Sequence, residues 1–80
     1  MIPDEILLGL REVMASEFSV LIGKGEHVIK VLVGADDMAL FTKYMGSSYN
    51  GDLWGANVIV EGHRGVTLIG NNGTLHTVID

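Results

Sequence analysis

The sequence predicts an α+β fold: a two-layer sandwich of about five mostly antiparallel strands, with two helices on one face. Three observations predict it. An apolar stripe at helical spacing follows Pro3, short β-branched runs separated by turn residues fill the last third of the chain, and two further such runs occupy residues 18–34. The chain has 80 residues, which is the size of one domain spanning 1–80.

The first helix is expected from Pro3 to about Ser16. Proline suits the first helical position, and Asp4 and Glu5 favour the positive end of the helix dipole. The apolar residues that repeat at helical spacing are Ile6, Leu7, Leu10, Val13 and Met14. This pattern predicts a helix that packs on one face of a sheet.

A central hairpin is expected next, with strands over about 18–23 and 27–34 joined by a glycine-containing turn. The second strand is apolar at every position from Val28 to Val33 except Lys30, so we expect it in the middle of the sheet. A second helix is expected over about 37–45. Asp36 would be its N-cap, and Gly46 would end it.

Three short strands are expected in the last third, at about 57–61, 66–70 and 74–79, after the irregular stretch 47–55. Asn72-Gly73 between β-branched residues is a strong hairpin signal. A two-residue turn there pairs Leu68 with Thr77 and Val66 with Ile79. It also places five residues on one face: Val66, Leu68, Leu75, Thr77 and Ile79. The predicted element order is α-β-β-α-β-β-β, and consecutive hairpins make the pairing mostly antiparallel.

Composition argues against several classes of function. The net charge is −5, and the five basic residues are scattered, so nucleic acid is not an expected partner. The absence of cysteine excludes disulfides, thiolate zinc sites and iron–sulfur clusters. No apolar run reaches about 18 residues, so no membrane span is expected. The N-terminus has no signal-peptide pattern, and we expect a cytoplasmic protein.

Self-association is expected because apolar residues exceed what one core needs. Hydrophobic residues make up 48% of the chain, and both faces of the predicted strands are rich in Val, Ile and Leu. Such a face marks an interface, and a two-fold homodimer is the commonest solution. The predicted interface residues are Ile29, Val31, Val33, Ile69 and Val78. The alternative is that the sheet closes into a small barrel that buries its own second face.

No catalytic or metal-binding motif is present. The three histidines, His27, His63 and His76, lie in or beside expected turns and strand ends without metal-ligand spacing, so we interpret them as turn and surface residues. Gly23-Lys24-Gly25 lacks the phosphate-loop pattern and joins two expected strands. No serine lies in a nucleophile-elbow motif. We therefore expect no catalytic residue, no metal and no cofactor.

Two loops are the expected partner-binding regions, because exposed loops carry function more often than helices and strands do. The stretch 47–55 sets aromatic side chains among Gly, Ser and Asn, and the turn 62–65 carries a basic residue. The predicted partner-binding residues are Tyr49, Asp52, Trp54, His63 and Arg64. The alternative for Trp54 is that its ring folds back to close the edge of the core.

The sequence therefore favours a small non-catalytic interaction module: a homodimeric accessory, regulatory or inhibitory protein of bacterial or phage type that occupies the surface of a larger protein. The alternative is a small enzyme or ligand-binding protein with its site at the subunit interface. Tyr44, Trp54, His63 and Arg64 would line that site. A deep polar pocket would favour the second hypothesis, and an apolar surface patch without such a pocket would favour the first.

Overall fold

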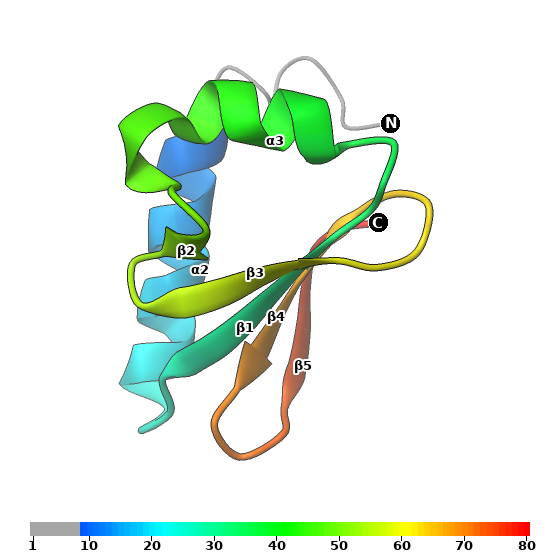
Figure 1. Ribbon diagram of the computed structural model, residues 1–80. Helices are drawn as coiled ribbons and strands as arrows, with labels where there is room; N and C mark the ends of the chain where they lie inside the picture. Colours follow the sequence, from blue (N-terminus) through cyan, green and yellow to red (C-terminus); the bar gives the residue numbers. More distant parts are fainter. Residues whose placement is uncertain (1–8) are drawn as a thin grey trace.

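The computed structural model describes residues 9–80 and has an α+β fold (Figure 1). Its elements in chain order are α2 (Leu10–Gly23), β1 (Val28–Val33), α3 (Met38–Met45), the 3-10 turn η1 (Gly46–Ser48), β2 (Asp52–Leu53), β3 (Ala56–Val60), β4 (Val66–Gly70) and β5 (Leu75–Ile79). The predicted class, with two helices and five strands, is confirmed. The helix start predicted at Pro3 lies outside the described residues.

The five strands form one mixed sheet in the order β2-β3-β1-β4-β5. β1 is parallel to β3, and all other neighbours are antiparallel. The predicted element order is therefore wrong, because β1 has no hairpin partner before it. The predicted antiparallel character is also wrong, because β1 lies parallel to β3 after a crossover that contains α3. The predicted barrel alternative is also wrong, because β2 and β5 are the free edges of an open sheet. The central position predicted for β1 is confirmed.

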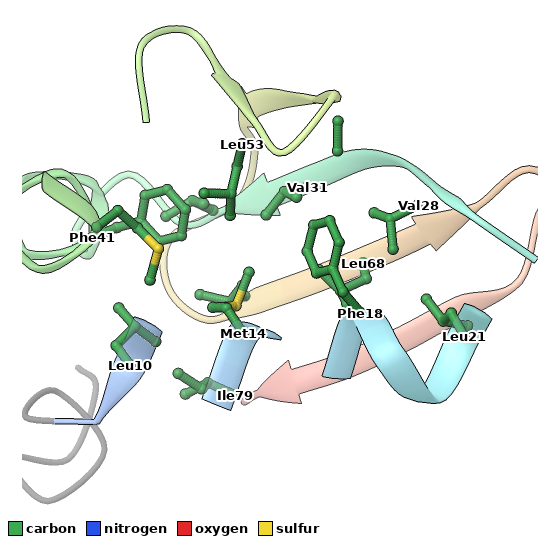
Figure 2. Packing of buried hydrophobic residues seen from close by; sticks show 14 residues of the cluster. Leu10, Met14, Phe18, Leu21, Val28, Val31, Phe41, Leu53, Leu68 and Ile79 are labelled. Atoms are coloured by element: carbon green, nitrogen blue, oxygen red, sulfur yellow. The ribbon is translucent and has the colours of Figure 1, made fainter. Parts of the chain in front are cut away.

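The first predicted strand, 18–23, is helical in the structure and forms the last turns of α2. The buried residues of this helix are Leu10, Met14, Phe18 and Leu21. Their spacing of three or four residues places them on one face of a helix, which is the face turned to the sheet in Figure 2. The β-branched residues Val20 and Ile22 lie on the solvent side, with 41% and 62% of their surface exposed.

The β4–β5 hairpin has a longer turn than the two residues predicted. The Gly70 N–H donates to the Thr74 carbonyl at 2.9 Å, and the Gly73 N–H donates to the Gly70 carbonyl at 2.9 Å. Leu68 consequently pairs with His76 instead of Thr77. A register change of one residue turns side chains to the other face, so the prediction that Leu75 and Thr77 share a face with Val66 and Leu68 is wrong.

An irregularity further along β5 restores the predicted register at its end. Thr67 pairs with Thr77, but Val66 pairs with Ile79, so Val78 is an extra residue in the ladder. Ile79 returns to the core face through this bulge and is 6% exposed. The predicted pairing of Val66 with Ile79 is confirmed.

The core lies between the helices and one face of the sheet (Figure 2). Helix α3 contributes Phe41 and Met45, and it ends at Gly46, whose φ of 56° favours glycine. Its N-cap is Asp37, not Asp36 as predicted. The buried strand residues are Val28, Val31, Val33, Leu53, Ala56, Val66, Leu68 and Ile79. No helix in the described part of the chain is long and apolar enough to cross a membrane.

Candidate functional site

The predicted partner-binding residues fall into two groups that the structure does not bring together. Tyr49, Asp52 and Trp54 precede β3, whereas His63 and Arg64 follow it. A strand of five residues spans about 17 Å, so the two groups lie at opposite ends of the sheet. The five residues therefore do not lie together at one site within a single copy of the chain. That either group contacts a partner stays a prediction.

The aromatic residues of the first group contact the core. The Tyr49 ring meets the Phe41 ring edge-on, with 5.7 Å between ring centroids. The Trp54 ring meets the Phe18 ring at 90°, with 5.2 Å between centroids. Trp54 is still 43% exposed, so it both closes the core edge and presents part of its ring to solvent.

The backbone at Trp54 explains why this ring stands at the surface. Trp54 and Gly55 form the two-residue turn between β2 and β3, and both have positive φ angles, 50° and 89°. Hairpin turns of this length favour Asn, Asp or Gly at such positions, and a bulky residue there costs about 1–2 kcal/mol. The edge-on contact with Phe18 offsets part of that cost.

The second group lies in a loop that is locked to the start of α3. The β1–α3 connection and the β3–β4 loop run side by side in Figure 1. Gly34 donates to the Gly65 carbonyl at 2.9 Å, and Asp36 donates to the His63 carbonyl at 2.8 Å. The Asp37 carboxylate, 1% exposed, accepts from the Gly65 N–H at 2.7 Å. We call residues 34–37 together with 61–65 the loop clasp.

The histidines do not converge. The backbone of His27 exchanges hydrogen bonds with Asn71, whose side-chain oxygen accepts from the His27 N–H at 3.1 Å. The His76 imidazole contacts the carboxylate of Glu17 on α2, and His63 is exposed in the loop clasp. Residues 9–80 hold no group of three His, Asp or Glu side chains placed to bind a metal ion. The same residues enclose no pocket.

The sheet face turned away from the helices of residues 9–80 forms a regular surface. In the register of the strands, one row runs across the whole sheet: Asp52, Asn57, Lys30, Ile69 and Leu75. A second row beside it holds Ile59, Leu32, Thr67 and Thr77. Ile29 stands next to the first row at the irregularity in β1. We call these ten residues the uncovered sheet face, because the two helices of the described residues, α2 and α3, pack on the opposite side.

The uncovered sheet face is aliphatic at its centre and at the β5 edge. Ile29 is 38% exposed, and Leu75 is 68% exposed. Leu32, Ile59 and Ile69 are partly exposed, and they lie outside the set of residues that pack against the core. The only charged groups on this face are Lys30 and Asp52, of opposite sign, so the face is nearly neutral on a protein of charge −5. Its chemistry is that of apolar contact with a few threonine hydroxyls.

The predicted interface residues divide between the two faces of the sheet. Ile29 and Ile69 lie on the uncovered sheet face. Val31 and Val33 lie on the other face, fully buried beneath the helices, and Val78 packs against the core. Contact between this face and a second subunit stays a prediction. Sequence reasoning left out Leu32, Ile59 and Leu75. The alternation of side chains along β1 and β3 could have placed Leu32 and Ile59 on this face. Placing Leu75 there required knowledge of the actual β4–β5 register.

Comparison with known proteins adds no functional assignment. The sequence matches no protein-family model, and neither the curated proteins nor the solved structures contain a significant match. The function is therefore argued from the surface chemistry alone.

Proposed function

We propose that this protein is a non-catalytic interaction module that binds a partner protein through the uncovered sheet face. One observation carries the proposal: five aliphatic side chains stand on the side of the sheet that no described helix covers. They are Ile29, Leu32, Ile59, Ile69 and Leu75. A sheet face that only meets water is usually polar, and a contiguous apolar patch marks an interaction surface.

The aliphatic residues of this face have no role in the core. The core cluster draws its strand residues from the other face, and it is closed by Phe18, Phe41 and Met45 from the helices. The side chains of Ile59 and Ile69 keep part of their surface in contact with water in the single chain. Burying each of them against a partner would remove further apolar surface from water, at about 25 cal/mol per Å².

The near neutrality of the uncovered sheet face indicates which kind of partner surface it would bind. The remaining surface carries most of the acidic residues, which repel acidic proteins and disfavour nonspecific contact. Lys30 stands within the aliphatic patch, between Asn57 and Ile69. A partner surface that is apolar and carries one carboxylate opposite Lys30 fits this arrangement. The proposed action is occupation of that partner surface, as in accessory, regulatory or inhibitory proteins.

The proposal is tested by removing apolar groups from the face without disturbing the core. The variant Ile59→Thr/Ile69→Thr keeps β-branched side chains, which suit strands. The control Val20→Thr/Ile22→Thr removes apolar groups that are more exposed, at 41% and 62%, from the solvent side of α2. Both proteins are used as bait in lysate of the native host, and recovered proteins are quantified by mass spectrometry.

A true partner is recovered by the unaltered protein and by the α2 control, and its recovery falls at least about tenfold with the face variant. Purified partner then gives the affinity directly by calorimetry. Equal recovery with the face variant, or loss with the α2 control, would overturn the proposal. Thermal melts of both variants show that each remains folded.

A further inference from the structure

The two edge strands of the sheet, β2 and β5, differ in how well they are protected against pairing with a strand of another chain. β2 has only two residues, and it is followed at once by the tight turn at Trp54-Gly55. β5 has five residues, with no proline and no charged side chain between Leu75 and Ile79. Proteins commonly protect edge strands with lysine, proline or very short length. β5 contains no lysine and no proline. A bulge also protects an edge, but the one at Val78 leaves the stretch from Leu75 to Thr77 regular. β5 stands at the open end of the sheet in Figure 1.

The hydrogen-bonding groups that β5 offers follow from the hairpin turn. The Thr74 carbonyl points toward β4, because it accepts from the Gly70 N–H. Backbone groups of successive residues point to opposite sides of a strand, so those of His76 also point to β4. The N–H and C=O groups of Leu75 and Thr77 point away from β4, to the free edge. The bulge at Val78 ends this regular pattern.

We propose that two copies of this chain pair edge to edge through β5, antiparallel, about a two-fold axis that passes between the two His76 residues. Leu75 then stands opposite the partner's Thr77. Each such pair exchanges two backbone hydrogen bonds, so the axis generates four. The result is one continuous sheet of ten strands, with the helices of both copies on the same side.

Three features favour a second copy over a foreign strand as the occupant of this edge. The regular edge offers the outward groups of only two residues, and a two-fold pairing uses all of them without reaching past the bulge. β5 contains no Asp, Glu, Lys or Arg, so its pairing with a second copy places no two of these side chains of like charge opposite each other. Leu75, which is 68% exposed in the single chain, gains a cross-strand neighbour.

Edge pairing goes beyond the proposed function and does not depend on it. It leaves the uncovered sheet faces open and joins them on one side, so a single copy of the assembly presents two aliphatic patches next to each other. On the helix side, each His76 contacts its own Glu17, and the axis brings these two contacts together. A protein that pairs at β5 yet binds no partner through its face would refute only the proposed function.

The direct test is amide hydrogen exchange by NMR, at protein concentrations above and below the dimer's dissociation range. In the dimer, the Leu75 and Thr77 amides are expected to be protected at high concentration and to exchange faster on dilution. The His76 amide, bonded to β4, is the internal reference. Fast exchange of Leu75 and Thr77 at every concentration would overturn the proposal.

A pair of substitutions separates backbone pairing from side-chain contact. Thr77→Pro removes an outward N–H at an edge position where proline is tolerated, and it deletes two of the four bonds in the dimer. Thr77→Val keeps the N–H and the side-chain volume. We expect dimer dissociation to be at least about tenfold easier for Thr77→Pro than for Thr77→Val, measured by light scattering over a dilution series.

A further variant separates edge pairing from stacking of the two faces. Asn57→Lys places a charge on the uncovered sheet face in β3, with β1 and β4 between it and β5. The dimer should survive this substitution. Loss of the dimer in Asn57→Lys, equal dimerisation of Thr77→Pro and Thr77→Val, or a monomer in the unaltered chain would each refute pairing through β5.

Discussion

The carboxylate of Asp37 accepts a hydrogen bond of 2.7 Å from the backbone N–H of Gly65, 28 residues further along the chain. This bond joins the start of α3 to the loop that connects β3 with β4. Both partners are buried, so water cannot replace either one. Asp37 is at the N-cap position of α3 but makes no capping bond with its side chain, because its carboxylate is directed to Gly65.

Replacement of Asp37 by alanine is expected to lower the free energy of unfolding by about 2–3 kcal/mol, since it leaves the Gly65 N–H buried without this acceptor. The matched control is Asp36→Ala, which removes an exposed carboxylate next to it and should change stability by less than about 0.5 kcal/mol. Urea unfolding followed by circular dichroism measures both. Equal midpoints for the two variants would show that the bond to Gly65 does not stabilise the fold.

Gly34 is expected to tolerate no side chain. A Cβ at this position would lie 2.1 Å from the Cα of Arg64, and that backbone is held by the loop clasp. Gly34→Ala should therefore destabilise the protein by about 3 kcal/mol or more, as expected when overpacking forces the backbone to shift. Thermal unfolding is the measurement.

Gly23→Ala is the control for that substitution, because a Cβ there meets nothing within 4 Å. Gly23 is the last residue of α2, where alanine should leave stability unchanged or raise it by up to about 1 kcal/mol. If Gly34→Ala melts at the same temperature as Gly23→Ala, Gly34 does not lie against the backbone of Arg64 in solution.

The contact between Phe18 and Trp54 is expected to be energetically coupled. In a double-mutant cycle with Phe18→Leu and Trp54→Leu, the coupling free energy should be about 0.5–1.5 kcal/mol, the range for edge-to-face rings. Denaturant unfolding of the four proteins gives the value. A coupling near zero would mean that the two rings do not touch in solution.

The hairpin register predicts that two leucines of the β4–β5 pair differ sharply. Leu68 is fully buried and Leu75 is 68% exposed. Leu68→Ala should cost about 2–5 kcal/mol, whereas Leu75→Ala should cost less than about 1 kcal/mol when both are measured at low protein concentration. Similar losses of stability for the two variants would instead support the two-residue turn, in which Leu68 and Leu75 lie on the same face of the hairpin.

The fold class was predictable, but the order of the elements was not. Runs of β-branched residues marked β1, β3, β4 and β5 correctly, because alternation along a strand is a local signal. The same signal misled at 18–23, where Val20 and Ile22 stand on the outside of a helix. The helical spacing from Met14 through Phe18 to Leu21 was present in the sequence, but it competed with a convincing hairpin pattern.

The parallel pairing of β1 with β3 escaped for a different reason. Consecutive strands usually pair with each other. No local sequence pattern indicates that a strand after a helix, such as β3, lies parallel to an earlier strand, such as β1. The contact between Asp37 and Gly65 is equally non-local. The uncovered sheet face was anticipated in kind, since an excess of apolar residues was evident, but its membership depended on a one-residue difference in a turn.

The loop clasp determines which surface positions of this chain can tolerate amino-acid substitution. Most of its bonds join backbone to backbone, so they do not depend on the side chains at Ala35, Asp36 and His63, all of which are exposed. Gly34, Asp37 and Gly65 are constrained by packing or bonding, and Gly62 is constrained by its φ of 77°. Substitutions at Ala35, Asp36 and His63 should therefore leave the shape of both loops unchanged. This end of the sheet can accept new surface side chains, whether they arise by natural mutation or from a library of random codons.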